Sequence, residues 1–480
     1  MANIDLSHHL SAEARLRKPT AMKEIWRLAS RKPNMVSLAN GDPPNTLYPI
    51  KKVLFEIASP WGDDPVAAWK TEGSNTATQV ISATRDGPSV LPVKKAMQYT
   101  NGAGHVETQK AVSELAHAYH HPPNHVITLT LGNGDAVTKC FRLFGNPGDH
   151  FLADEFTFSA LVQAAIPQGI KWVPVRMDDG GMLPEQLEKI MVNWDATRGP
   201  RPHVLYTIPC GQNPTGSTLS VERRRKIYEL AQRFDLIIIE DDPYYFLQFP
   251  SNSAADTTFT PSFLSMDVDE RVVRVDSFSK VIAPGTRLGW ITSSAQFHEQ
   301  LVALTDASSQ HPHAFGQMFL SELLGPEGWQ LPGFDKWVRG LGMEYKRRCD
   351  FFLDLFAKEV ATTGLAEAIA PEAGMFVWTR IHISKHPRYR KSIASSEEVK
   401  VPRTNCKQLM EELFDTCLDE GLVVMPASIF KVDSDAQYGD PEDNIEDRLN
   451  YFRLTYCGTE EIMTTGLSTL GRALKRFFAD

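Results

Sequence analysis

Cysteine is scarce in this sequence, and the few cysteines do not group. Six cysteines are spread over 480 residues, and no two of them form a Cys-x-x-Cys pair or another metal-ligand spacing. Scattered cysteines in a long chain are typical of reduced thiols in a cytosolic-type compartment. Histidines at 120–121 and 311–313 stand beside prolines without acidic or cysteine partners, so we expect a cytoplasmic protein without a metal site.

The sequence also lacks a long apolar run and an excess of positive charge. No apolar stretch approaches the roughly 20 residues that a membrane-spanning helix needs, and the first residues show no secretory signal. The formal net charge is −9, with 59 acidic and 50 basic side chains. This balance disfavours nucleic acid and anionic membranes as partners. We therefore expect a globular protein without either partner.

Short apolar segments alternate with helical patterns between residues 99 and 330. Strands that alternate with helices indicate βαβ units and a mostly parallel sheet. Continuous apolar strands fit a sheet that is covered on both faces. The sequence therefore predicts an α/β fold, with strands at 125–131, 150–153, 171–175, 203–208, 236–240, 271–275 and 288–292.

The chain on either side of this region has a different character. Residues 60–92 are rich in Gly, Ser, Thr, Asp and Pro, and residues 381–404 are polar and basic. Both are expected to be irregular surface insertions. Beyond residue 330, long helical patterns alternate with a few strands. We expect an N-terminal arm with an insertion at 1–98, a large domain at 99–330 and a smaller α+β domain at 331–480.

A lysine framed by two hydroxyls is the segment with the clearest chemistry. Ser277-Phe278-Ser279-Lys280 follows an expected strand, and Arg287 comes soon after it. A lysine amine forms a Schiff base with an aldehyde, while hydroxyls and a guanidinium bind phosphate. The segment therefore suits an aldehyde that carries a phosphate. A solvated surface lysine after a strand is the alternative.

A glycine-rich turn joins the strand at 125–131 to the helix that follows. In Gly132-Asn133-Gly134-Asp135, glycine lets the backbone approach a ligand closely. The helix N-terminus offers free N–H groups to an anion. Asn133 and Gly134 are therefore candidate phosphate-binding residues, although a strand-to-helix turn without a ligand explains the same pattern.

Three further strands end in polar or aromatic residues. Asp241 ends a buried strand, where its carboxylate needs a cation, either a protonated ring nitrogen or a surface arginine. Pro243 stiffens the backbone ahead of Tyr244. The Asn213 amide lies in a turn after a strand, where it is placed to donate to a phenolate oxygen or serves the turn alone. Phe158 offers a ring for stacking on a planar ligand or for the core.

An arginine interrupts the apolar strand pattern at 451–455. A buried guanidinium is costly without a carboxylate, so Arg453 is expected to pair with one. The partner is either a substrate or an internal aspartate or glutamate.

These residues follow one another in a fixed order from residue 132 to residue 453. In that order the chain resembles the fold-type I aminotransferases of classes I and II, which use pyridoxal 5′-phosphate (PLP). It looks most similar to fungal aromatic-amino-acid aminotransferases and to kynurenine/2-aminoadipate aminotransferases, over nearly the whole chain. The segments that carry the resemblance are Ser37-Leu38-Ala39-Asn40-Gly41, Gln98-Tyr99-Thr100, Asn146-Pro147-Gly148-Asp149, Asn213-Pro214-Thr215-Gly216, Glu240-Asp241-Asp242-Pro243-Tyr244-Tyr245-Phe246 and Asp276-Ser277-Phe278-Ser279-Lys280.

The resemblance implies a role for each candidate residue. Lys280 would form the Schiff base with PLP and then act as the general base on the substrate. Asp241 would keep the pyridine nitrogen protonated. Tyr244 and Asn213 would bind the ring oxygen, and Phe158 would stack on the ring. The phosphate would be held by Asn133, Gly134, Ser277, Ser279 and Arg287.

The resemblance also implies substrate contacts and a second subunit. Arg453 would bind the substrate α-carboxylate through two parallel hydrogen bonds, with Gly41 and Asn213 near the substrate. Tyr99 would reach the phosphate of the neighbouring subunit, which implies a homodimer with shared active sites. Thr20 stands about where some relatives carry an arginine for acidic side chains, which disfavours acidic donors.

Transamination of an aromatic L-amino acid (Phe, Tyr or Trp) with a 2-oxo acid such as 2-oxoglutarate is the function that the resemblance implies. Kynurenine or 2-aminoadipate transamination is one alternative, and a PLP-dependent lyase or decarboxylase on the same fold is another. A PLP-binding transcription regulator would need a DNA-binding module ahead of this fold. The first hundred residues show neither a helix-turn-helix pattern nor a basic surplus.

Overall fold

The computed structural model describes residues 4–18, 21–31, 33, 36, 38, 41–72, 77–250, 258–391, 404–433 and 444–479. Contacts group the chain into two compact units, each built from three segments. Unit 1 comprises Met1–Pro147, Ile237–Pro243 and Pro261–Leu341, and unit 2 comprises Gly148–Leu236, Tyr244–Thr260 and Gly342–Asp480. The expected division at residues 98 and 330 stays a prediction.

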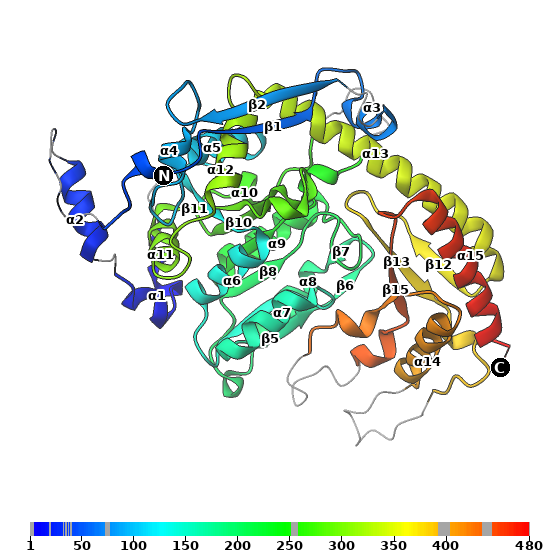
Figure 1. Cartoon of the computed structure of the whole chain (residues 1–480). Helices are drawn as coiled ribbons and strands as arrows, with labels where there is room; N and C mark the ends of the chain where they lie inside the picture. The colour runs from blue at the N-terminus through cyan, green and yellow to red at the C-terminus, as the bar shows by residue number, and fades with distance from the viewer. Residues whose placement is uncertain are drawn as a thin grey trace. The chain divides into compact units, whose positions relative to one another are not determined.

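A seven-stranded sheet confirms the expected α/β fold (Figure 1). Its strand order is β3-β11-β10-β9-β8-β4-β5. β10 runs parallel to β9, and β4 runs parallel to β5 and β8, whereas β11 is antiparallel to both β10 and β3. The strands are β3 (His125–Thr130), β4 (His150–Asp154), β5 (Lys171–Val175), β8 (Val204–Thr207), β9 (Ile237–Asp241), β10 (Val272–Ser277) and β11 (Gly289–Ser294).

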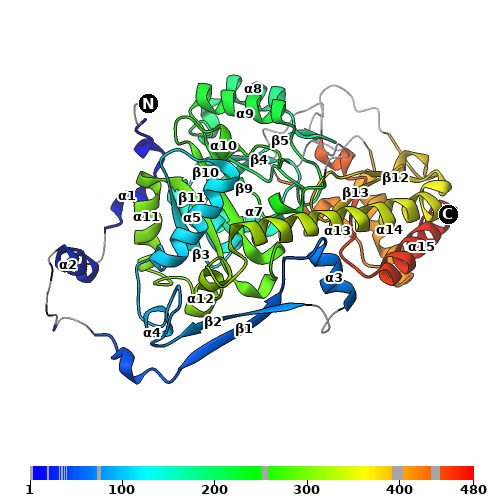
Figure 2. The same ribbon diagram turned by 90° about the horizontal axis from the view of Figure 1, so that it is seen from above.

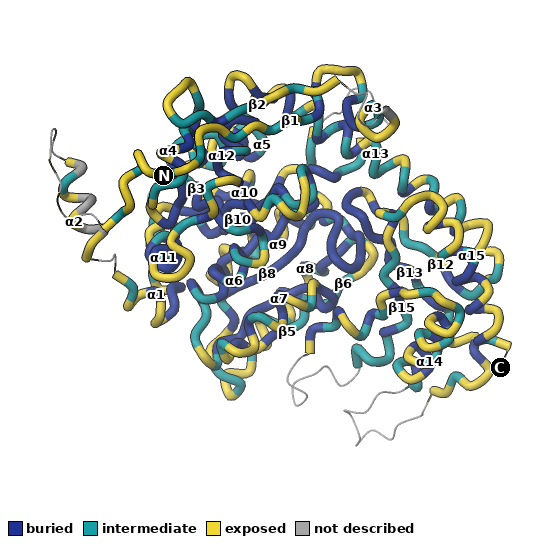
Figure 3. The backbone as a smooth tube through the Cα atoms, viewed as in Figure 1, coloured by how far each residue is buried: buried dark blue, intermediate teal, exposed yellow. Residues whose placement is uncertain are grey.

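Unit 1 holds β3, β11, β10 and β9, with helices packed on them. α6 (Asn133–Phe144) contacts all four strands, and α5 (Val106–His120) and α11 (Ala295–Asp306) pack on β3. β9, β10 and β11 are buried along their whole lengths, as the dark blue tube at β10 illustrates in Figure 3, and burial of both faces of the sheet explains the apolar runs with which β9 and β10 begin. The other helices of unit 1 are α1 (Ala12–Leu16), α2 (Ala21–Ser30), α3 (Pro65–Glu72), α4 (Val93–Ala96), α10 (Phe263–Met266), α12 (Ala314–Leu323) and the first part of α13 (Gln330–Glu359).

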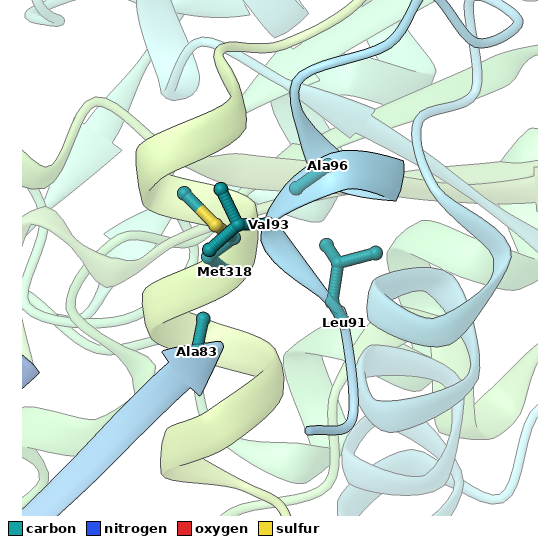
Figure 4. Packing of buried hydrophobic residues seen from close by; sticks show 5 residues of the cluster. All are labelled: Ala83, Leu91, Val93, Ala96 and Met318. Atoms are coloured by element: carbon teal, nitrogen blue, oxygen red, sulfur yellow. The ribbon is translucent and has the colours of Figure 1, made fainter. Parts of the chain in front are cut away.

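The segment at residues 60–92 is more regular than expected. It contains α3, and its β2 (Thr78–Thr84) pairs antiparallel with β1 (Lys52–Ala58). The prediction of an irregular insertion is wrong for these elements, because β2 alternates in burial and turns Ile81 and Ala83 inward. Ala83 belongs to a small apolar cluster, shown in Figure 4, whose other members are Leu91, Val93, Ala96 and Met318.

Unit 2 holds β8, β4 and β5 together with a second, antiparallel sheet (Figure 2). The strands of that sheet, in spatial order, are β12 (Ala366–Ile369), β13 (Phe376–Ile381), β15 (Tyr451–Thr455) and β14 (Met425–Pro426). A short hairpin joins β6 (Met177–Asp178) to β7 (Gly181–Met182). The helices of unit 2 are α7 (Ser159–Ala165), α8 (Pro184–Val192), α9 (Val221–Phe234), the rest of α13, α14 (Cys406–Asp419) and α15 (Glu460–Phe477).

Some residues named from the sequence lie outside the described residues. They are Thr20, Ser37, Ala39, Asn40, residues 73–76 of the first expected insertion and residues 392–403 of the second. In the part of the chain that the structure describes, no helix has both the length and the apolar character needed to span a bilayer.

Candidate functional site

In unit 1, the turn between β3 and α6 lies against Arg287. Gly132 has a φ of +101°, and a Cβ atom on it would lie 2.8 Å from Arg287 Nη2, so the turn requires glycine. Arg287 Nη2 donates to the Leu131 carbonyl oxygen at 2.8 Å, and its Nη1 donates to Ser279 Oγ at 3.4 Å. Gly132 is the N-cap residue of α6 and makes no side-chain cap hydrogen bond to the first turn of this helix. Free N–H groups at a helix N-terminus bind phosphate, and a neighbouring guanidinium adds positive charge.

The lysine segment begins where β10 ends. Ser277, the last residue of β10, accepts a hydrogen bond from the Ser279 N–H at 3.0 Å, and the two hydroxyl oxygens lie 2.9 Å apart. Phe278 is buried against Trp290, which fixes the 3-10 turn that follows the strand. Lys280 ends this turn and is half-buried. The two serines and the lysine are therefore held on one short, rigid segment.

Asp241 ends β9 in a buried position, with 2% of its surface exposed. Its carboxylate accepts a hydrogen bond from the side-chain amide of Asn133. The Asn133 Oδ1 atom is buried without a hydrogen-bond partner among the described residues. Burial, and after it the charge of Asp241, raises the pKa of the Cys140 thiol on α6. The structure thus brings together Asn133 and Asp241, which lie 108 residues apart in the sequence.

A buried ion cluster surrounds Arg274 on β10, and the sequence reasoning missed it. The guanidinium lies 2.8 Å from Asp276, 3.0 Å from Asp242 and 3.2 Å from Glu240. All four side chains are buried. The sequence does contain a signal for this cluster. Arg274 interrupts an apolar strand, as Arg453 does, and a buried arginine needs a carboxylate partner.

In unit 2, the guanidinium of Arg453 lies against an amide and two aromatic rings. Arg453 Nη1 donates to Asn213 Oδ1 at 2.8 Å. Its Cζ lies 4.5 Å from the ring centre of Phe376 and 4.8 Å from that of Phe430. Arg453 forms no ion pair with any residue that the structure describes. Sequence reasoning missed both rings, since a phenylalanine in such a segment is most often a core residue.

The remaining candidates differ in their surroundings. Tyr244 is buried in unit 2, where its ring meets Phe376 edge to face at 5.7 Å. Phe158 is 37% exposed and Tyr99 is 62% exposed. Gly41 is exposed, and no atom lies within 4 Å of a Cβ added to it. Within the described part of unit 1, neither Tyr99 nor Gly41 is hydrogen-bonded to the other candidates.

The residues of unit 1 fit a phosphate-bearing aldehyde cofactor. The first turn of α6, the hydroxyls of Ser277 and Ser279 and the guanidinium of Arg287 supply donors for a phosphate. The buried Oδ1 of Asn133 is an acceptor that a ligand donor would satisfy. Lys280 supplies an amine for the aldehyde.

Comparisons with known proteins agree with this chemistry. The family model described as aminotransferase class I and II matches residues 68–470. The L-tyrosine:2-oxoglutarate aminotransferase amt1 of Serpula lacrymans var. lacrymans is 49% identical over 507 residues, covering 99% of this chain and 96% of that protein. An aromatic amino acid aminotransferase of Schizosaccharomyces pombe is 34% identical, covering 98% and 97%. The crystal structure of aminotransferase Aro8 from Candida albicans matches with a TM-score of 0.85 at 30% identity, covering 100% and 99%. The chain therefore belongs to the aminotransferase class I and II family, with the fold-type I architecture that its sequence predicts.

Proposed function

We propose that this protein transfers the amino group of an aromatic L-amino acid to a 2-oxo acid such as 2-oxoglutarate, with PLP as its cofactor. Similarity along almost the whole chain supports this substrate pair. The relatives concerned are L-tyrosine:2-oxoglutarate aminotransferases of Serpula lacrymans var. lacrymans, 49% identical, and of Tapinella panuoides, 48% identical.

The observation that carries the proposal is the guanidinium of Arg453, which no described carboxylate neutralises. Asn213 and two aromatic rings hold it in place. Burial lowers the pKa of Arg453, yet a guanidinium remains protonated at neutral pH. Its planar fork matches a carboxylate with two parallel hydrogen bonds. Amino-acid donors and 2-oxo-acid acceptors both carry an α-carboxylate, so Arg453 would bind each in turn.

The cofactor would be held by residues of unit 1. PLP, when bound, withdraws electrons from the substrate Cα and makes its proton acidic. The buried carboxylate of Asp241 favours a protonated ring nitrogen. Because the Asn133 side chain is bonded to Asp241, we assign the backbone N–H groups at Asn133 and Gly134 to the phosphate. The other proposed phosphate ligands are Ser277, Ser279 and Arg287.

Lys280 is the proposed general base. Its amine takes the proton from the substrate Cα, which requires a neutral amine for part of the cycle. Tyr244 and Asn213 are the proposed donors to the ring oxygen, and Phe158 is proposed to stack on the ring. Gly41 is proposed to lie near the substrate.

We also propose a cytoplasmic homodimer in which Tyr99 binds the phosphate of the cofactor in the neighbouring subunit. The exposure of Tyr99 leaves its hydroxyl accessible to a second chain. Light scattering gives the mass, and a PLP titration compares Tyr99→Phe with the wild type. A dimer whose variant binds PLP more weakly supports the proposal, while a monomer, or unchanged affinity, contradicts it.

A panel of amino donors with 2-oxoglutarate tests the proposed substrate class. We expect kcat/KM for Phe, Tyr and Trp to exceed that for kynurenine and 2-aminoadipate by about 10- to 200-fold, the range that pocket contacts provide. Product analysis in the same assay should find a 2-oxo acid. Release of ammonia or CO₂ would instead indicate a lyase or a decarboxylase, and a faster reaction with kynurenine or 2-aminoadipate would overturn the aromatic assignment.

A further inference from the structure

Arg274 is the centre of a buried charge cluster in unit 1. Its Nε and Nη2 atoms donate to the two oxygens of Asp276 at 2.9 and 2.8 Å. Its Nη1 donates to Asp242 at 3.0 Å and lies 3.2 Å from Glu240. Glu240 also accepts two backbone N–H groups at the start of α10, at 2.8 and 3.1 Å. Arg274, Glu240 and Asp276 are therefore each held by more than one contact.

Two members of the cluster flank Asp241 in the sequence: Glu240 on β9, and Asp242 directly after this strand. Arg274 pairs with Glu240 across the parallel ladder of β10 and β9. Successive side chains of a strand point to opposite faces of the sheet. The guanidinium therefore holds Glu240 and Asp242 from one face, while Asp241 meets Asn133 from the other.

On β10, the same guanidinium holds the residue that precedes the phosphate-binding segment. Asp276, bound through both of its oxygens, is followed directly by Ser277, whose hydroxyl is bonded to Ser279. One side chain thus fixes the ends of two adjacent parallel strands, and each strand carries a group assigned above to the cofactor.

We propose that Arg274 is a positioning residue that sets the places of Asp241 and Ser277 and thereby the orientation of bound PLP. This proposal rests on the proposed function, in which those two residues contact the cofactor. A guanidinium suits the task because its planar fork binds several carboxylates in a fixed geometry. A lysine ammonium is a point charge on a flexible stem and cannot reproduce that geometry.

Burying this cluster in the sheet costs free energy, because each charged group loses its hydration. One cation faces three carboxylates. Burial raises the pKa of Asp276 to about 7, although the positive charge of Arg274 acts to lower it. Well-packed apolar side chains of similar volume are often as stable as a buried ion cluster, or more stable. The arrangement is therefore better explained by the precision with which it places the strand ends.

The test compares Arg274→Lys with Arg271→Lys in the PLP-loaded protein. Arg271 directly precedes β10, is also buried, and forms a 2.8 Å ion pair with Asp269. Neither Arg271 nor Asp269 adjoins a residue assigned to the cofactor. The measurements are the PLP dissociation constant and the visible circular dichroism per bound PLP, which reports the orientation of the cofactor.

We expect R274K to bind PLP about 10- to 100-fold more weakly, the range found for outer partners of ligand-holding residues in metal sites. Its visible circular dichroism should differ from the wild type even at saturating PLP. R271K should match the wild type in both measurements. An R274K protein that matches R271K in both overturns the proposal.

Two further outcomes are informative. A wild-type protein that does not bind PLP overturns the proposed function, and this inference with it, before any variant is compared. If far-ultraviolet circular dichroism shows that R274K is unfolded, Glu240→Gln takes its place, because the amide keeps the shape of the side chain but loses the ion pair beside Asp241. Weaker PLP binding by E240Q supports the proposal, and unchanged binding overturns it.

Discussion

The substitution Gly132→Ala tests whether the turn between β3 and α6 binds the phosphate of PLP. Gly132 has φ +101° and ψ 177°, a conformation that costs about 1–3 kcal/mol for other residues. The new Cβ would lie 2.8 Å from Arg287 Nη2 and 3.3 Å from its Cζ, so the guanidinium must move. A hydrogen bond to a charged group contributes about 1.5–3 kcal/mol. We therefore expect Gly132→Ala to raise the PLP dissociation constant by about 10- to 150-fold.

Gly148→Ala is the matched control for this substitution. Gly148 has φ +93°, and no atom lies within 4 Å of an added Cβ, so the variant is strained without being crowded. PLP affinity is measured by quenching of intrinsic fluorescence. Stability is measured on cofactor-free protein, because a bound ligand raises Tm by mass action. Both variants should lose about 1–3 kcal/mol of stability, and only G132A should bind PLP more weakly. Equal PLP affinities would refute the placement of Arg287 at the phosphate.

Lys280→Ala should abolish transamination while leaving the far-ultraviolet circular dichroism unchanged, and retained turnover would contradict its role as the base. Arg453→Lys keeps the charge but loses the planar fork, so kcat/KM should fall by about 10- to 100-fold for both the donor and 2-oxoglutarate. Steady-state kinetics in which one of the two substrates is unaffected would contradict a shared carboxylate site. Burial raises the pKa of Asp154 to about 7, so the folded chain holds this proton more tightly than the unfolded chain does. The resulting stability is complete below about pH 4 and is lost as the pH rises through 7, at about 1.4 kcal/mol per pKa unit. Asp154→Asn should therefore flatten this decline by up to about 4 kcal/mol in urea unfolding between pH 4 and 8, and an unchanged profile would rule the explanation out.

The strands of the central sheet could be predicted because short apolar segments of the sequence indicate them directly. The segments at 236–240 and 288–292 are short and apolar, and the structure has β9 and β11 there. β2 was harder to predict because it lies in a segment rich in turn-forming residues. Its regularity comes from pairing with β1, and composition does not encode that contact.

Two arginines explain why only part of the site could be predicted. Arg274 and Arg453 both interrupt apolar strands, and in each case the sequence demands a carboxylate. In the structure Arg274 finds internal carboxylates, including Asp242 at a separation of 32 residues. Arg453 instead binds Asn213, 240 residues away, and no described carboxylate. Tertiary contacts decide between an internal and an external partner, and a local pattern does not contain them.

The position of β3 at the edge of the seven-stranded sheet has a consequence for biosynthesis. Its neighbour in the sheet is β11, with Thr130 opposite Gly289 and His125 opposite Ser294. Ribosomes add roughly 5–20 residues per second. The interval between the synthesis of β3 and that of β11 is therefore on the order of ten seconds. During that interval the nascent chain exposes an apolar strand with unsatisfied backbone groups, on which chaperone binding competes with aggregation. The turn between β3 and α6 is thus synthesised well before Arg287, the residue against which it lies.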